Sequence, residues 1–197
     1  MTDSRVQIDP DLVRRFAEGD QEAFGAIFRL SAPHAYRLAL RITGQPQAAE
    51  DIVQDTFVRL WEARERLNPT GSVRSFILRI TANLCLDRFR RLRRETSLEA
   101  DEVLLETASD PGGSDWDGAI DRMAVQQAFE CLPPMYRATL ALRYGEDLNY
   151  REIADALGIT VTAVALRILR GKDLLRAHFA AKRQRSGENH DKSSHSM

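Results

Sequence analysis

Residues 149–179, NYREIADALGITVTAVALRILRGKDLLRAHF, carry the pattern that decides the fold. Asn149 can cap a first helix, and Glu152 stands three residues later, which is the spacing of a capping box. Gly158 lies where a helix end favours a left-handed residue, and Thr160 can cap a second helix. Two helices joined by this turn predict a helix-turn-helix, the motif that places one helix in the DNA major groove. The pattern also fits an ordinary helical hairpin with a solvated basic side.

The second helix of this motif has two different faces. Its apolar stripe is expected to be buried, with Gly171 allowing close approach of a neighbouring helix. The stripe consists of Val161, Val164, Ile168, Leu175 and Phe179. The opposite face consists of Thr162, Arg167, Arg170 and Lys172. Its basic side chains make nucleic acid the first partner to consider.

Charge is distributed unevenly along the chain. Of 197 residues, 28 are Lys or Arg and 29 are Asp or Glu, so the net charge is −1. The stretch between Arg94 and Arg122 holds nine acidic residues and no basic one, and basic clusters flank it. This segregation predicts two small domains joined by a flexible linker. The expected boundaries are 1–94 for the first domain, 95–118 for the acidic linker, 119–181 for the second domain and 182–197 for a disordered tail.

Apolar residues recur at helical spacing almost throughout, and no stretch shows sustained strand alternation. The predicted fold class is therefore all-α, with about four helices in each domain. Before the 149–179 motif, helices are expected over 11–19, from residue 20, over 33–43, 46–66, 72–94, 119–132 and 134–144.

Several classes of protein are excluded by what the sequence lacks. Cys85 and Cys131 lie alone in apolar helical patterns, so both are expected to be buried, reduced thiols. The four histidines have no ligand spacing and no Gly-rich phosphate loop occurs, so the sequence predicts no metal, no cofactor and no enzyme. The chain has neither a signal-peptide pattern at its start nor an apolar run approaching the length of a membrane span. A cytoplasmic protein without membrane insertion is expected.

The helix expected over 46–66 has a polar face opposite its apolar stripe. Asp51, Gln54 and Asp55 fall at i, i+3 and i+4 on this face. They can accept hydrogen bonds from Arg or Lys of a partner, or they can form an ordinary solvated acidic face.

The helix expected over 72–94 ends in five arginines within seven residues, preceded by Asn83 and Asp87. Arginine neutralises phosphates and asparagine can read base edges, while Phe76 and Phe89 offer stacking surface. Five arginines exceed what is needed to complement a helix dipole, so nucleic acid is the favoured partner.

Four motifs in this order resemble the group IV, or extracytoplasmic-function, sigma factors of bacterial RNA polymerase. They are AEDIVQDTFVRLWE at 49–62, FILRITANLCLDRFRR at 76–91, LPPMYRATLALRY at 132–144 and YREIADALGITVTAVALRILRGKDLLR at 150–176. The resemblance implies a minus-10 reading domain and a minus-35 reading domain joined by a flexible linker. It implies an alternative sigma factor that binds core RNA polymerase, directs initiation at specific promoter DNA and is controlled by an anti-sigma factor.

The resemblance also assigns roles to residues. Binding to the coiled coil of the polymerase largest-subunit clamp falls to Asp51, Gln54 and Asp55, and the motif with Pro133, Arg137 and Leu140 is expected to meet the flap. Minus-10 DNA binding falls to Leu67, Asn68, Phe76, Asn83, Asp87, Arg88, Arg90 and Arg91, with loop 67–73 receiving a flipped base. Minus-35 DNA binding falls to Tyr150, Thr162, Ala165, Leu166, Arg167, Leu169, Arg170 and Lys172.

The chain departs from the family pattern at two places. Phe76-Ile77 stands where the family commonly has Trp-Leu, so stacking is kept but the indole donor is lost. Residues 162–166 read TAVAL where the family commonly has GTVKS, which makes the base-facing positions short or apolar. Such positions suit thymine methyl groups better than hydrogen-bonding base edges. Leu166 and Leu169 fit DNA or an inhibitory protein partner equally well.

Two other classes of function compete with this interpretation. A helix-turn-helix repressor or activator that acts without replacing sigma would use residues 149–179 alone. The acidic face and the arginine-rich helix would then have no role. A purely protein-binding helical module predicts no segregation of basic residues, which is contrary to the sequence.

Overall fold

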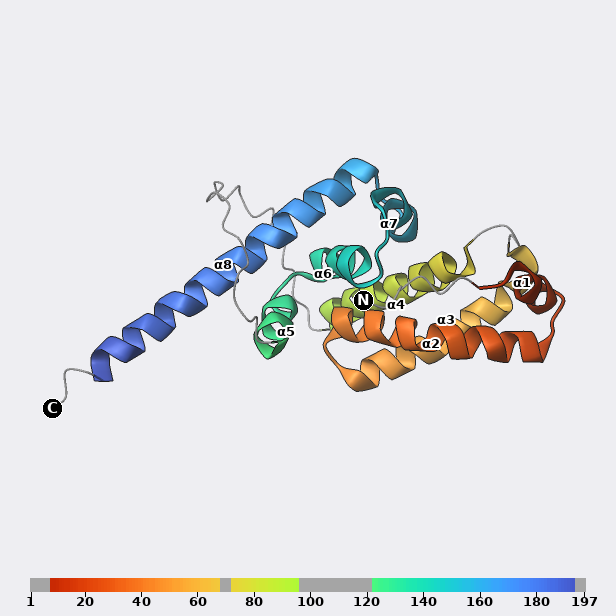
Figure 1. Ribbon diagram of the computed structural model, residues 1–197, viewed down its shortest axis with the longest axis horizontal. Helices are drawn as coiled ribbons and strands as arrows, with labels where there is room; N and C mark the ends of the chain where they lie inside the picture. Colours follow the sequence, from red (N-terminus) through yellow and green to blue (C-terminus); the bar gives the residue numbers. More distant parts are fainter. Residues whose placement is uncertain (1–7, 68–71, 96–121, 194–197) are drawn as a thin grey trace.

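The computed structural model describes residues 8–67, 72–95 and 122–193, and all regular secondary structure within these ranges is helical (Figure 1). The first half contains α1 (Pro10–Ala17), α2 (Gln21–Thr43), α3 (Pro46–Glu62), a short 3-10 turn η1 (Arg64–Arg66) and α4 (Val73–Glu95). The second half contains α5 (Arg122–Glu130), α6 (Pro134–Leu140), a π-helical segment η2 (Ala141–Gly145), α7 (Tyr150–Leu157) and α8 (Val161–Ser193). The all-α prediction is confirmed.

Local capping chemistry sets the start and end of α2. The Asp20 carboxylate accepts hydrogen bonds from the backbone amides of Glu22 and Ala23, at 2.8 and 3.1 Å. These amide bonds, together with Arg15, lower the pKa of Asp20 below its ordinary value. Gly44 ends the helix in the left-handed region, with φ of 72°, which a residue without Cβ adopts at little cost.

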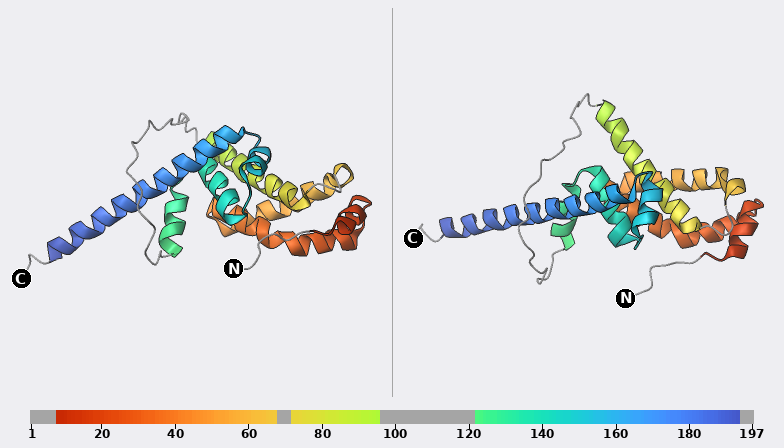
Figure 2. Two further views of the ribbon diagram at one scale, coloured as in Figure 1. Left: turned by 45° about the horizontal axis from the view of Figure 1, so that its top comes forward. Right: turned by 90° about the horizontal axis from the view of Figure 1, so that it is seen from above.

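Helices α2, α3 and α4 form a bundle that α1 covers at one end (Figures 1 and 2). An aromatic group closes this end, with ring centroids 5.6 Å apart for Phe16 and Phe24 and 5.2 Å apart for Phe24 and Trp61. Between α3 and α4, the buried hydroxyls of Thr56 and Thr81 lie 3.3 Å apart, and each also donates to its own helix backbone. No polar atom of this pair is therefore left without a partner.

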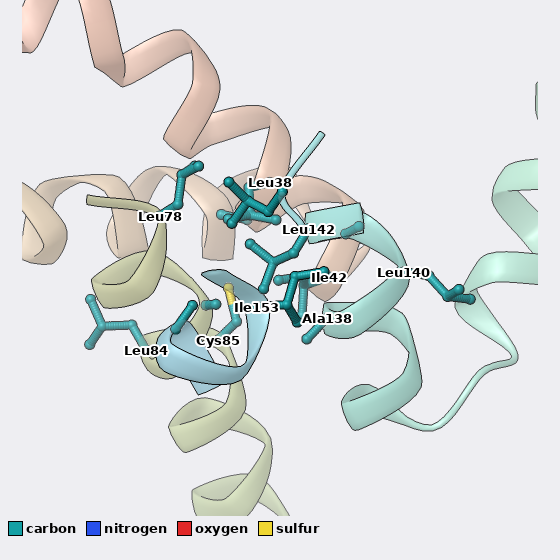
Figure 3. Close-up of a cluster of buried hydrophobic side chains, with 14 of the residues drawn as sticks. Leu38, Ile42, Leu78, Leu84, Cys85, Ala138, Leu140, Leu142 and Ile153 are labelled. Atoms are coloured by element: carbon teal, nitrogen blue, oxygen red, sulfur yellow. The ribbon is translucent and has the colours of Figure 1, made fainter. Parts of the chain in front are cut away.

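The second half packs against α2 and α4 of this bundle rather than standing apart from it. One buried cluster joins α2 and α4 to α6, η2 and α7, and Figure 3 shows its side chains converging from both halves. Its members include Leu38, Ile42, Leu78, Leu84, Cys85, Ala138, Leu142 and Ile153. The described residues of the two expected domains thus share a hydrophobic core. The expected linker lies outside the described residues, except for Glu95 at the end of α4.

Helix α2 corrects the expectation that a separate helix starts at Pro33. A single helix runs from Gln21 to Thr43 with Pro33 inside it. Proline removes one backbone hydrogen bond and usually breaks a helix. Here Ile27, Ala35 and Leu38 are all buried on either side of Pro33, while the proline itself is exposed. Burial of this common face stabilises the continuous helix despite the lost hydrogen bond.

Two other helix ends differ from expectation. The helix expected to reach residue 66 ends at Glu62, and a 3-10 turn replaces its last residues. The helix expected over 134–144 changes at Ala141 into the π-helical segment η2. Residues 137–142 are all buried, so the run of burial begins in α6 and continues into η2.

Burial corrects two further expectations. Cys85 is buried, but Cys131 is exposed because it lies at the turn between α5 and α6. Val161 was expected in the buried stripe of α8 but is exposed, because it is the first residue of that helix and precedes the part that enters the core. Helix α8 runs to Ser193, into the segment 182–197 where the sequence predicts disorder (Figure 2).

We predict that Leu38→Ala lowers the free energy of unfolding by about 2–5 kcal/mol, because the truncation leaves a cavity in the shared cluster. Leu38 is fully buried. The matched control is Leu30→Ala on the same helix, where the side chain is 43% exposed and the expected change is small. Urea unfolding of both variants measures the difference, and equal losses would contradict this account of the core.

Candidate nucleic-acid interface

The capping box of the expected helix-turn-helix is present. Asn149 Oδ1 accepts from the backbone amide of Glu152 at 3.0 Å, and Glu152 Oε2 accepts from the Asn149 amide at 2.7 Å. Gly158 ends α7 with φ of 64°, in the left-handed region. Thr160 Oγ1 accepts from the Ala163 amide at 3.1 Å and so begins α8. Asn149 and Glu152 therefore begin α7, Gly158 ends it and Thr160 begins α8, as the sequence predicts.

Helix α8 turns its inner face toward α6 and α7. Val164 and Ile168 are buried there, in agreement with the predicted stripe. A Cβ on Gly171 would lie 2.9 Å from Leu140 Cδ1, which is closer than packed carbon atoms approach. Gly171 therefore lets α8 lie directly on α6, and this contact determines which side chains of α8 point outward.

The outer face of α8 combines apolar and basic groups. Leu166 and Leu169 are 44% and 56% exposed, and the Lys172 ammonium lies 5.3 Å from the ring centroid of Tyr144. Thr162 and Ala165 are also exposed, whereas Arg167 and Arg170 are half-buried. The face therefore offers methyl groups and cations, with few groups that could read base edges by hydrogen bonds.

Tyr150 is the first residue of α7. Its ring is partly exposed, and the Arg143 guanidinium lies 5.7 Å from the ring centroid. A ring held by a cation in this way is positioned at low entropic cost for contact with a partner.

The residues expected at the minus-10 element are not all equally accessible. Asn83 Nδ2 donates to the carbonyl oxygen of Ala156 on α7 at 3.2 Å. Asp87 accepts from Arg90 at 2.7 Å in an ion pair one turn apart. Arg90 and Arg91 are exposed, and Arg88 is half-buried. The arginine-rich end of α4 thus faces solvent, while Asn83 is half-buried and hydrogen-bonded to the second half.

Aromatic and loop residues of the expected minus-10 surface lie at the other end of α4. Phe76 is half-buried against the aromatic end of the bundle, with Arg79 6.0 Å from its ring centroid. Leu67 is also half-buried against that cluster. Asn68 and the rest of the loop up to Gly71 lie outside the described residues.

Phe89 offers less stacking surface than the sequence suggests, because its side chain is half-buried. Its ring packs against the shared cluster, with the Arg137 guanidinium 5.6 Å from the ring centroid. Periodicity along α4 does not reveal that a second domain packs on this face.

Arg137 and Leu140, expected near the polymerase flap, are buried in this arrangement. Arg137 donates to the carbonyl oxygens of Ile42, Glu130 and Leu132, at 2.7, 2.6 and 3.0 Å. Burial lowers the pKa of Arg137 from its ordinary value, but the three carbonyls compensate the charged form. Arg137 therefore ties α2 to the turn between α5 and α6.

The acidic face of α3 is where the sequence places it. Asp51, Gln54 and Asp55 are exposed, and the buried residues Ile52, Val53 and Phe57 lie on the other side of the helix. The fold therefore leaves two carboxylates and an amide together on one rigid surface, available to a basic partner.

Sequence reasoning missed Glu146, which is the most buried acidic residue of the described chain. It follows η2 and lies against Arg74 and His34 of the first half. A single glutamate in a turn gives no sequence signal of burial, because its cationic partners are far away in the chain.

Comparisons with known proteins agree with the sequence resemblance. The family model described as "Sigma-70 region 2" matches residues 27–95, and that described as "Sigma-70, region 4" matches residues 122–175. ECF RNA polymerase sigma factor SigE of Mycolicibacterium smegmatis is 36% identical over 83% of this chain, which spans 65% of that protein. ECF RNA polymerase sigma factor SigW of Bacillus subtilis is 30% identical over 83% of this chain and 92% of that protein.

Solved structures share the fold. CnrH, in complex with the cytosolic domain of CnrY, superposes with a TM-score of 0.64 at 26% identity, over 91% of this chain and 99% of that chain. The sigma factor RpoE of Bartonella quintana, in complex with the anti-sigma factor NepR, gives a TM-score of 0.63 at 20% identity, over 80% of this chain and 96% of that chain. The fold and these matches define a two-region sigma factor. The chain belongs to the extracytoplasmic-function group of the sigma-70 family.

The described residues contain neither a candidate membrane span nor a candidate metal site. No helix among them is long and apolar enough to cross a membrane. Within the same ranges, no group of three or more His, Cys, Asp or Glu residues could hold a metal ion.

We predict that Asn149→Ala lowers the free energy of unfolding by about 1 kcal/mol, because the first turn of α7 loses its side-chain cap. Asn149→Asp, which can still accept from the Glu152 amide, serves as the matched control and is expected to stay close to the parent. Chemical denaturation followed by circular dichroism gives both values. An alanine variant as stable as the aspartate variant would show that the capping box contributes nothing.

Proposed function

We propose that this chain binds core RNA polymerase and directs initiation at its own set of promoters, using the two regions for two promoter elements. The observation that supports this most is the presence, on one chain, of an outward-facing helix-turn-helix, an arginine-rich helix and an exposed acidic face. A repressor that acts without replacing sigma needs only the first of these surfaces. Membership of the sigma family favours the same choice.

The acidic face of α3 is the proposed contact with polymerase. Asp51, Gln54 and Asp55 are exposed on a helix whose opposite side is fixed in the bundle. Arg side chains of the clamp coiled coil could bind both carboxylates with charge-assisted hydrogen bonds, which are stronger than neutral ones. A rigid helix loses little conformational entropy on binding, which favours such a docking site.

Helix α4 is the proposed contact with the melted minus-10 strand. Arg90 and Arg91 are exposed and can neutralise phosphates, while Arg88 lies half-buried beside them. Asn83 and Asp87 precede these arginines by one or two turns, so they lie where bases of the same strand would pass. Phe76 and Leu67 extend this surface toward the loop that follows α3.

The outer face of α8 is the proposed contact with the minus-35 element. Ala165, Leu166 and Leu169 present methyl groups suited to thymine, and Arg167, Arg170 and Lys172 lie where they can approach phosphates. Thr162 and Tyr150 flank these residues. We expect specificity here to depend partly on DNA shape, because base-edge hydrogen bonds are few.

An anti-sigma factor is the second proposed partner. Two structural neighbours form complexes with other proteins, RpoE with the anti-sigma factor NepR and CnrH with the cytosolic domain of CnrY. Leu166 and Leu169 form an exposed apolar pair that suits such a protein as well as DNA. A sigma factor acts where RNA polymerase is, so we expect this chain in the bacterial cytoplasm. In this role the chain itself catalyses no covalent reaction.

We predict that the double substitution Asp51→Ala, Asp55→Ala weakens binding to core polymerase at least tenfold, because both charge-assisted contacts are lost. The matched control removes two exposed carboxylates at the α1–α2 corner, Glu18→Ala with Glu22→Ala. Fluorescence anisotropy with purified core measures the affinity. Unchanged affinity of the α3 variant would contradict the proposed docking surface.

A further inference from the structure

Glu146 is buried between the two halves of the chain. Its side chain is 1% exposed, and three basic side chains of the first half surround its carboxylate. Arg74 Nη2 lies 2.9 Å and His34 Nδ1 3.1 Å from Oε2, and Arg41 Nη1 lies 3.7 Å from Oε1. Arg74 Nη2 also donates to the Glu146 carbonyl oxygen at 3.2 Å. Glu146 comes from the second half, and its partners come from α2 and α4.

A buried carboxylate depends on its partners. Removing it from water is costly, and this cost is offset only while cationic groups and hydrogen bonds surround it. Separation of the two halves would return Glu146 and the three basic side chains to water. The ion pairs of Glu146 form only in the closed arrangement. Removing one partner leaves the others buried without compensation, which shifts the equilibrium between the closed and open chain toward the open form.

Gly145 makes room for one of these partners. A Cβ at this position would lie 2.0 Å from Arg41 Nη1 and 3.0 Å from Arg41 Cζ, so the guanidinium passes directly over the glycine backbone. Any larger residue would push Arg41 away from Glu146. The glycine is therefore required by the ion cluster and not by its own backbone conformation.

The cluster is incompletely satisfied. Glu146 Oε1 and Arg41 Nη1 are buried yet make no hydrogen bond to any described residue, and their separation of 3.7 Å is too long for one. Unsatisfied buried polar atoms oppose burial. These two atoms weaken the cluster without cancelling the contacts of Glu146 with Arg74 and His34, which suits a contact that must open.

In the closed arrangement the second half contacts Asn83, which the proposed minus-10 surface uses. The second half places α7 on α4, where the Ala156 carbonyl accepts from Asn83 Nδ2 at 3.2 Å. Arg137 of α6 holds the same two halves together through the Ile42 carbonyl at 2.7 Å. While α7 lies there, one N–H of the Asn83 amide is engaged and the half-buried side chain is less accessible to single-stranded DNA.

We propose that Glu146, bound by Arg74, His34 and Arg41, is a latch that keeps the free chain closed, with α7 covering part of the minus-10 surface of α4. Binding to core polymerase then requires the two halves to separate. The proposal of a latch is supported by the ion pairs of Glu146 and does not depend on the proposed function. Its consequence for DNA rests on the proposed function.

The thiol of Cys85 can report separation of the two halves. Cys85 is buried in the cluster shared by the two halves, beside Ile153 of α7 (Figure 3). Burial raises the pKa of its thiol to about 12, so the closed form holds little of the reactive thiolate. Cys131, the second of the two cysteines, is exposed and can be replaced by serine.

The test measures the rate at which a thiol reagent modifies Cys85 in the full chain carrying Cys131→Ser. We expect Glu146→Gln and Arg74→Ala each to raise the rate at least tenfold. The Cys85 modification rate of the double variant should be close to that of each single variant, because both substitutions break the same ion pair. Gly145→Ala should act in the same direction through Arg41. Matched controls are Glu22→Gln and Arg14→Ala, whose side chains are exposed and far from the cluster.

Several results would overturn the latch. Rates equal to that of the parent in both Glu146→Gln and Arg74→Ala would do so, as would fully additive effects in the double variant. Circular dichroism must show that each variant keeps its helices, so that global unfolding is not mistaken for opening. If Glu146→Gln fails to fold, Arg74→Ala and Gly145→Ala decide the question.

A second measurement separates the latch from the proposed function, since Cys85 modification involves neither polymerase nor DNA. A fluorescent single-stranded oligonucleotide carrying a minus-10 sequence, selected with the parent holoenzyme, is titrated with the free chain. We expect Glu146→Gln to bind it more tightly than the parent, and Asn83→Ala to cancel the gain. Faster Cys85 modification without tighter oligonucleotide binding would overturn the covering of a DNA surface and leave the latch in place.

Discussion

Ile153 of α7 packs into a cluster with Leu38 and Ile42 of α2 and with Leu78 and Cys85 of α4, and this burial determines where the second half lies. Without it, the two regions would be independent bundles on a linker. With it, α7 covers one side of α4, and α8 is directed away from the first half (Figure 2). Apolar burial supplies the stabilisation, while Arg137 and Glu146 fix the orientation through directional contacts.

The same arrangement sorts the functional surfaces by accessibility. The acidic face of α3 and the outer face of α8 remain exposed, so the proposed clamp contact and the minus-35 contact are accessible in the closed chain. Asn83 is half-buried and bound to α7, and Arg137 and Leu140 are buried. Polymerase could therefore first meet the closed chain through Asp51 and Asp55, and a change in the packing of the halves would uncover the remaining contacts. This order gives core polymerase control over DNA binding.

What the sequence predicts well is local. The capping box at Asn149, the left-handed Gly158 and the buried Val164 and Ile168 depend on neighbours within a few residues, so periodicity and turn chemistry reveal them. The packing of Phe89 and the partners of Glu146 depend on contacts between distant segments, which no local pattern encodes. Pro33 shows the same limit, because tertiary burial overrides a local helix breaker.

The central claim is that this chain converts core polymerase into a promoter-specific enzyme. Core polymerase reconstituted with the chain, given a library of random duplex DNA, tests it most directly by selection followed by run-off transcription. The account predicts transcripts from templates that share two short elements at a fixed spacing, and none without the chain. Failure to bind core, together with tight binding of the free chain to a palindromic duplex, would contradict the claim and identify a helix-turn-helix regulator instead.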